Sequence, residues 1–119
     1  MPTDSELKIA VCDDIEKDRI QIINMTKGIL QDMQVSCSIV GYKDGPSLLA
    51  DIQNGSKFHI MLLDVMMDEM DGMELAAELR KQGNRTAIIF ISINREMALY
   101  GYEVSAVRYL IKPLEERKL

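Results

Sequence analysis

Short apolar runs alternate with stretches of helical periodicity along the whole chain. Five of these runs have the length and composition of buried strands. They are LKIAV at 7–11, VSCSIVGY at 35–42, HIMLLD at 59–64, AIIFI at 87–91 and VRYLI at 107–111. The third run is apolar without alternation, which indicates a strand that is covered on both faces.

Amphipathic helices are predicted between these strands. The first should follow Asp13 and Asp14, with Ile15, Ile22, Met25, Ile29 and Met33 on one stripe. Others are predicted after the turn KDGPS, between Gly72 and Gly83, and around Met97–Val104, where apolar residues recur at helical spacing. Strict alternation of strand and helix predicts an α/β fold, with a parallel sheet, right-handed crossovers and helices on both faces.

The polar residues that follow the strands predict a ligand site at one edge of the sheet. In open parallel sheets, ligands gather at the carboxyl ends of the strands. The polar residues at those ends are Asp13, Asp14, Asp64, Ser92 and Lys112. Because an unpaired buried carboxylate is costly, Asp64 is expected to face water, an ion or a ligand.

The residue types at this edge favour phosphoryl chemistry. Three converging carboxylates repel one another unless a cation compensates, and oxygen ligands with room for water suit Mg²⁺. A lysine and a hydroxyl opposite the acids would serve an anion with several oxygens, such as a phosphoryl group. A carboxylate can also act as a nucleophile and form an aspartyl-phosphate, and Asp64 on the central strand is best placed for that role.

Composition and charge limit the partners and the cellular location that this segment can have. The 119 residues are 47% hydrophobic, enough for one core, and the net charge of -5 with a pI near 4.8 argues against nucleic-acid binding by this segment. No apolar run is long enough to cross a membrane, and the first residues lack the layout of a signal peptide. Two cysteines at opposite ends of neighbouring strands, Cys12 and Cys37, predict reduced thiols and a cytoplasmic location.

These motifs together resemble the receiver domain of two-component response regulators, the CheY-like family, over essentially the whole chain. The matching pieces are the Asp13-Asp14 pair, LLDVMM around Asp64 with Asp71-Gly72, Ser92, and Tyr109 three residues before Lys112-Pro113. The stretch SINREMALYGYEVSAVRYLIKPL further resembles receivers that precede LytTR-type DNA-binding domains. The resemblance implies a flavodoxin-like, doubly wound, five-stranded sheet in the order 2-1-3-4-5.

The resemblance also implies a role for each site residue. Asp64 would accept a phosphoryl group from the phosphohistidine of a sensor histidine kinase. Asp14, Asp64 and the backbone carbonyl of Met66 would bind Mg²⁺ directly, and Asp13 would bind it through water. Lys112 and Ser92 would contact the phosphoryl oxygens. Ser92 and Tyr109 would form the switch, so the domain would act as a signalling switch and not as an enzyme with a turnover substrate.

Two other readings of the same site stay open. A small Mg²⁺-dependent phosphatase also uses an aspartyl-phosphate, but it usually places an acid two residues after the nucleophile, where this chain has Met66. A degenerate receiver that acts as an interaction module is disfavoured by the intact acids, hydroxyl and lysine. The neighbouring acids Asp68, Glu69 and Asp71 are expected to form only a solvated loop.

The end of the chain carries a separate expectation. Seven residues, from Pro113 to Leu119, follow Lys112, so the last helix is expected to be truncated at about two turns. Residues 1–119 would then form the receiver domain, with an effector domain beyond them. The poorly covered sheet face would favour self-association or a homodimer.

Overall fold

The sheet has five parallel strands in the order predicted by the resemblance. The computed structural model describes residues 6–113 of the chain. The strands are β1 (Leu7–Cys12), β2 (Cys37–Tyr42), β3 (Ile60–Leu63), β4 (Ala87–Ser92) and β5 (Arg108–Ile111). They lie in the order β2-β1-β3-β4-β5, and every neighbouring pair is parallel. The flavodoxin-like fold is therefore confirmed, with β3 at the centre of the sheet.

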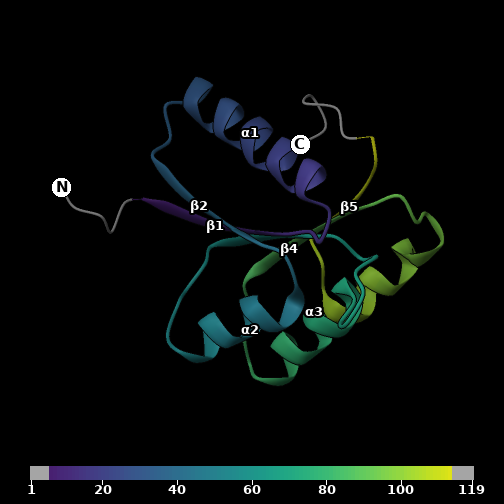
Figure 1. Ribbon diagram of the computed structural model, residues 1–119. Coiled ribbons are helices and arrows are strands. Elements are labelled where there is room, and N and C mark those ends of the chain that lie inside the picture. Colours follow the sequence, from purple (N-terminus) through teal and green to yellow (C-terminus); the bar gives the residue numbers. More distant parts are fainter. Residues whose placement is uncertain (1–5, 114–119) are drawn as a thin grey trace.

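Helices cover both faces of the sheet, as the alternation of elements requires. Helix α1 (Glu16–Asp32) lies on one face, and α2 (Gly45–Gln53) and α3 (Gly72–Lys81) lie on the other (Figure 1). The fourth helical segment, η2 (Glu96–Val104), packs beside α3 but is a 3₁₀ helix. Its backbone hydrogen bonds include one that the amide of Ala98 donates to the carbonyl of Arg95, three residues back. Over only nine residues, apolar spacing does not separate this tighter helix from an α-helix.

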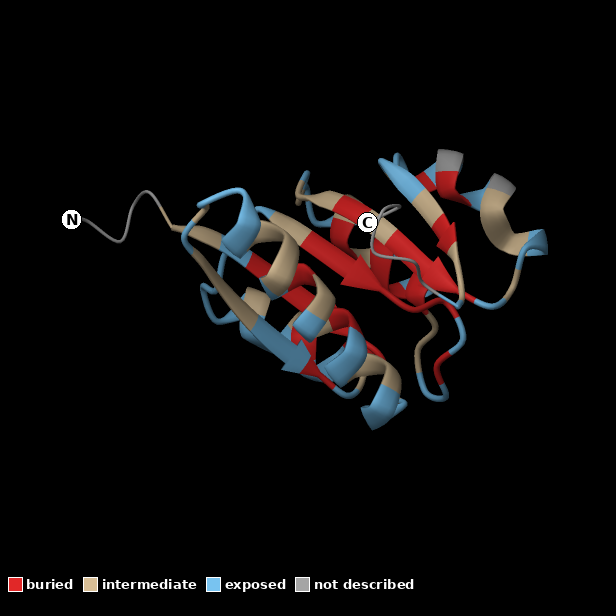
Figure 2. Ribbon diagram, turned by 90° about the horizontal axis from the view of Figure 1, so that it is seen from above, coloured by how far each residue is buried: buried red, intermediate tan, exposed pale blue. Residues whose placement is uncertain are grey.

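Alternate residues of each strand divide the core into two layers. In β1, Ile9 and Val11 pack toward α1, whereas Ala10 and Cys12 pack toward α2 and α3. All of β3 after its first residue is buried, as the continuous apolar run predicted. Figure 2 shows buried positions running along the central strands to their carboxyl ends. Two apolar layers therefore hold the strand ends in place.

The predicted stripe of α1 is wrong at its two ends. Ile15 is 51% exposed and Met33 is 64% exposed, because these residues are the two caps of α1 and lie outside its regular turns. The centre of the stripe is buried at Ile22 and also at Thr26, which the apolar pattern did not mark. The Thr26 hydroxyl donates a hydrogen bond of 2.8 Å to the carbonyl of Ile22, which satisfies the buried polar group.

The remaining sequence expectations divide between confirmed and untested ones. Cys12 and Cys37 are both free, and the strand register places them at opposite ends of β1 and β2. Among residues 6–113, no helix is long and apolar enough to span a membrane. The expected truncation of the last helix falls on residues 114–119, which lie outside the described part of the chain.

Candidate functional site

Three carboxylates meet at the carboxyl end of the sheet, as the strand ends predicted. Asp13 and Asp14 directly follow β1, and Asp64 directly follows β3. Each offers an oxygen, and these oxygens lie within 4.8 Å of one another. Asp13 and Asp64 are buried, with 0% and 3% exposure. A set of carboxylate oxygens this close together fits a hard divalent cation, which would offset their mutual repulsion.

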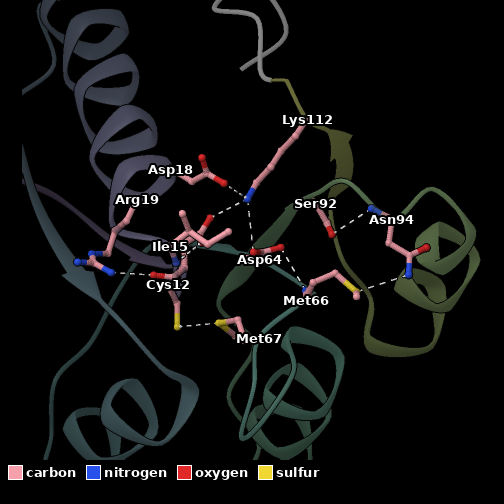
Figure 3. A network of polar contacts seen from close by, with 11 residues as sticks. Cys12, Ile15, Asp18, Arg19, Asp64, Met66, Met67, Ser92, Asn94 and Lys112 are labelled. Atoms are coloured by element: carbon pink, nitrogen blue, oxygen red, sulfur yellow. Dashed lines mark hydrogen bonds and ion pairs between the residues drawn. The ribbon is translucent and has the colours of Figure 1, made fainter.

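Lys112 closes the site from the end of β5. Its Nζ lies 3.0 Å from Asp13 Oδ2, 2.7 Å from Asp18 Oδ2 and 3.4 Å from Asp64 Oδ2 (Figure 3). Burial lowers the pKa of Lys112, but hydrogen bonds to Asp18 and Asp13 and the charge of Asp64 outweigh it and raise that pKa. The lysine is therefore a fixed positive charge among the acids. Sequence reasoning missed Asp18, although it lies one helical turn after Asp14.

Asp64 is held at its position by the strand and the loop around it. Its amide donates to the Cys12 carbonyl at 2.9 Å, and its Oδ1 accepts a hydrogen bond of 3.2 Å from the amide of Met66. Burial and then the charge of Asp13 raise the pKa of Asp64 to about 6, despite the opposing effect of Lys112. Asp64 is thus a buried acid whose ionised form is disfavoured even with the Lys112 ammonium 3.4 Å away.

This raised pKa predicts how the metal-free fold responds to pH. Because the folded pKa of about 6 lies above the usual 3.8, ionised Asp64 destabilises the fold above pH 6, and this penalty disappears as the pH falls toward 4. In EDTA at pH 8, we expect Asp64→Asn to raise the free energy of unfolding by about 1–3 kcal/mol. Urea denaturation should show this gain shrinking below pH 6. If Asp64→Asn were less stable than the wild type at pH 8, the raised pKa of Asp64 would be contradicted.

The loop after β4 links the Ser92 hydroxyl to Tyr109 through Asn94. The Ser92 hydroxyl accepts from the amide of Asn94 at 3.3 Å, and the Tyr109 hydroxyl donates to the Asn94 carbonyl. The Asn94 side chain accepts from the amides of Glu96 and Met97, at 2.9 and 3.3 Å, and so begins η2. Burial raises the pKa of Tyr109, while a hydrogen bond with Ser92 opposes the rise. Ser92 and Tyr109 are therefore linked, and Asn94 is the link that the motifs did not reveal.

The loop after β3 differs from the expected solvated acidic loop at one residue. Asp68 and Glu69 are exposed, as predicted. Asp71, however, is the N-cap of α3, where its side chain accepts a hydrogen bond of 2.8 Å from the amide of Glu74. The Glu74 side chain accepts in return from the amide of Asp71, at 3.1 Å. This capping box fixes the start of α3 beside the site, so Asp71 is a structural residue.

The arrangement has the parts that a phosphoryl acceptor needs. A buried carboxylate lies at the end of the central strand, with two further acids and a lysine ammonium around it. Ser92 is at the end of the next strand, and its carbonyl accepts a hydrogen bond of 3.0 Å from the amide of Lys112. Positive charge, hydrogen-bond donors and a carboxylate of a kind that can act as a nucleophile are thus gathered at one edge of the sheet.

Comparison with known proteins places this geometry in a family. The family model of the response regulator receiver domain matches residues 9–119. The chain is 28% identical to the sensory transduction protein LytT of Bacillus cereus over 116 residues, which are 95% of this chain and 44% of LytT. It is 42% identical to the positive alginate biosynthesis regulatory protein of Pseudomonas aeruginosa over 60 residues, which are 50% of this chain and 24% of that protein.

A solved structure supports the same grouping. The BeF3-activated receiver domain of DrrB, from Thermotoga maritima, superposes with a TM-score of 0.74 at 26% identity, covering 95% of this chain and 90% of that one. The chain spans less than half the length of the two curated relatives, so these relatives contain more than the region matched here. A family match over most of the chain, the sheet order and the acidic site agree. The chain belongs to the response regulator receiver domain family of two-component systems.

Proposed function

We propose that Asp64 is the phosphoacceptor of this receiver domain and that a sensor histidine kinase supplies the phosphoryl group. The observation that carries the proposal is the contact of Lys112 Nζ with both Asp13 and Asp64, at 3.0 and 3.4 Å. In the transfer, a carboxylate oxygen of Asp64 attacks phosphorus and the bond from phosphorus to the imidazole nitrogen breaks. The imidazole leaves with the electron pair of that bond, and Lys112 offsets charge on the phosphoryl oxygens.

The acidic cluster is the proposed site of Mg²⁺. Asp14, Asp64 and the backbone carbonyl of Met66 would bind the ion directly, and Asp13 would hold it through water. When bound, Mg²⁺ would neutralise charge on the acids and on the transferred group. The close approach of three carboxylate oxygens supports this assignment.

Ser92 and Tyr109 are the proposed readout of phosphorylation. A phosphoryl group on Asp64 would draw the Ser92 hydroxyl toward it, which changes the loop that Asn94 organises. Because the Tyr109 hydroxyl donates to the Asn94 carbonyl, a movement of this loop reaches β5 and η2.

By analogy with the relatives that are named as transcriptional regulators, the output would be a LytTR-type effector and the location cytoplasmic. The chain would self-associate or form a homodimer, and this segment itself would contact neither nucleic acid nor membrane.

The two alternatives predict different behaviour toward phosphate compounds. A phosphatase needs a general acid near the nucleophile, but the position two residues after Asp64 is Met66, whose side chain is an apolar thioether. An interaction module would not take up phosphate. The partly buried lysine and the buried carboxylates of Asp13 and Asp64 argue against a degenerate site, because an unused cluster of charges shielded from water only costs stability.

One experiment separates these functions. The chain is incubated with Mg²⁺ and phosphoramidate, whose phosphorus–nitrogen bond imitates that of phosphohistidine, and in parallel with p-nitrophenyl phosphate. We expect incorporation of one phosphoryl group per chain from phosphoramidate and no release of nitrophenol above the protein-free rate. Repeated release of nitrophenol would support the phosphatase, and no incorporation would support the interaction module.

A further inference from the structure

Within residues 6–113, the ammonium group of Lys112 has as many carboxylate partners as it has hydrogens. A lysine ammonium carries three N–H donors. Its partners here are Asp18 at 2.7 Å, Asp13 at 3.0 Å and Asp64 at 3.4 Å. The shortest of these contacts goes to Asp18, and the longest goes to the proposed phosphoacceptor. A phosphoryl group on Asp64 must therefore compete with a carboxylate for Lys112.

Asp18 approaches the ammonium from outside the acidic cluster. It lies in the first turn of α1, whereas Asp64 follows β3, and Figure 3 shows the two carboxylates reaching Lys112 from different sides. Its side chain is 28% exposed, compared with 3% for Asp64. Asp18 is also not among the three acids whose oxygens lie within 4.8 Å of one another. Its contact with the site is the hydrogen bond that it accepts from Lys112.

We propose that Asp18 is a positioning residue that competes with Asp64 for Lys112 and thereby weakens the hold of the site on a phosphoryl-like anion. The inference rests on the proposed function, because it concerns how strongly the phosphoryl group is bound. With Asp18 ionised, the ammonium is drawn toward α1 and each phosphoryl oxygen gains less from it. Without that charge, Lys112 is free to turn toward the anion.

The test measures the affinity for beryllofluoride, a phosphoryl mimic, by NMR titration at saturating Mg²⁺. Asp18→Asn should bind it about two- to fivefold more tightly, the range expected when a partly exposed ion pair is removed. Asp18→Glu keeps the charge and should restore an affinity near that of the wild type. The matched control is Asp32→Asn, which removes an exposed charge from the other end of α1. That end lies about 21 Å along the helix, beyond the ~10 Å screening length at 0.1 M salt.

A double-mutant cycle shows whether Asp18 acts through Lys112. In a Lys112→Met background no ammonium is left to release, so Asp18→Asn should no longer change the affinity for beryllofluoride. If that background binds the anion too weakly, the same cycle is measured with Mg²⁺ alone. Asp18→Asn should weaken Mg²⁺ binding about two- to fivefold in the wild-type background, because the released lysine competes for Asp13 and Asp64. It should leave Mg²⁺ binding unchanged beside Lys112→Met.

Each other outcome overturns a specific part of the argument. Equal effects of Asp18→Asn in both backgrounds would mean that its charge acts directly and not through the lysine. Reduced stability with unchanged affinities would mean that Asp18 only stabilises the first turn of α1. Either result overturns the inference while the proposed function stands. A wild-type chain that binds Mg²⁺ but no beryllofluoride would overturn the proposed function, and the inference with it.

Discussion

We expect Gly72→Ala to destabilise the fold by about 3 kcal/mol and to weaken Mg²⁺ binding. A Cβ atom at Gly72 would lie 2.2 Å from the backbone oxygen of Asp64, 2.9 Å from its carbonyl carbon and 3.0 Å from Val65 Cα. These are backbone atoms of the segment that carries Asp64, so no side-chain rotation relieves the clash. The start of α3 and the end of β3 must move apart, and Asp64 moves with them.

The matched control is Gly101→Ala in η2. Of the atoms that the structure describes, a Cβ atom there would meet only Ala106 Cβ, at 3.6 Å, which is an ordinary contact. Its free energy of unfolding should stay within about 1 kcal/mol of that of the wild type. Urea denaturation of both variants, followed by Mg²⁺ titration, checks the prediction. Equal stability of Gly72→Ala and Gly101→Ala would show that α3 does not press against the site in solution.

The second large effect is expected for Arg80→Ala, which should cost about 3 kcal/mol of stability. The Arg80 guanidinium donates to the carbonyls of Val104 and Thr86 at 2.7 Å, of Asn84 at 3.0 Å and of Ser105 at 3.2 Å. It thus connects the end of α3 to the loop before β4, to the end of η2 and to the turn before β5. Without it, several carbonyls lose a charged donor at once.

The loss of stability in Arg80→Ala should be concentrated at the junction of η2 and β5. Hydrogen exchange should accelerate most at the amides of Ala106 and Val107, whose bonds to Gly101 and Ile88 hold that junction. Lys81→Ala, at the neighbouring exposed position, is the control and should change stability by less than about 0.5 kcal/mol. Arg80→Lys should remain destabilised, because an ammonium cannot reach four carbonyls in a planar fork. Full stability in Arg80→Lys would contradict this explanation.

The sequence predicted those features that depend on periodicity and on strand ends. Alternating strands and helices determine a parallel sheet, and polar residues that directly follow the strands must share one edge. Asp13, Asp64 and Lys112 were therefore predicted together, and the structure places them in contact.

The missed features depend on side-chain direction and reach. Asp18 is one of several acids near the start of α1, and only the rotation of that helix shows that it points at Lys112. Arg80 looks like an exposed helical residue in sequence, yet it bonds to four carbonyls from two separate segments. Asp71 was assigned to an acidic loop, although the helix start predicted at Gly72 and Glu74 three residues after Asp71 are the sequence signature of a capping box. The contacts of Asp18 and Arg80 join elements whose relative rotation no local pattern encodes.

Intact-mass spectrometry tests the central claim most directly. The wild-type chain and Asp64→Asn are incubated with Mg²⁺ and phosphoramidate, with Asp68→Asn as a control that alters an exposed acid of the same loop. We predict that the wild type and Asp68→Asn gain the mass of one phosphoryl group, and that Asp64→Asn gains none. Undiminished phosphorylation of Asp64→Asn would contradict the assignment of Asp64 as the phosphoacceptor.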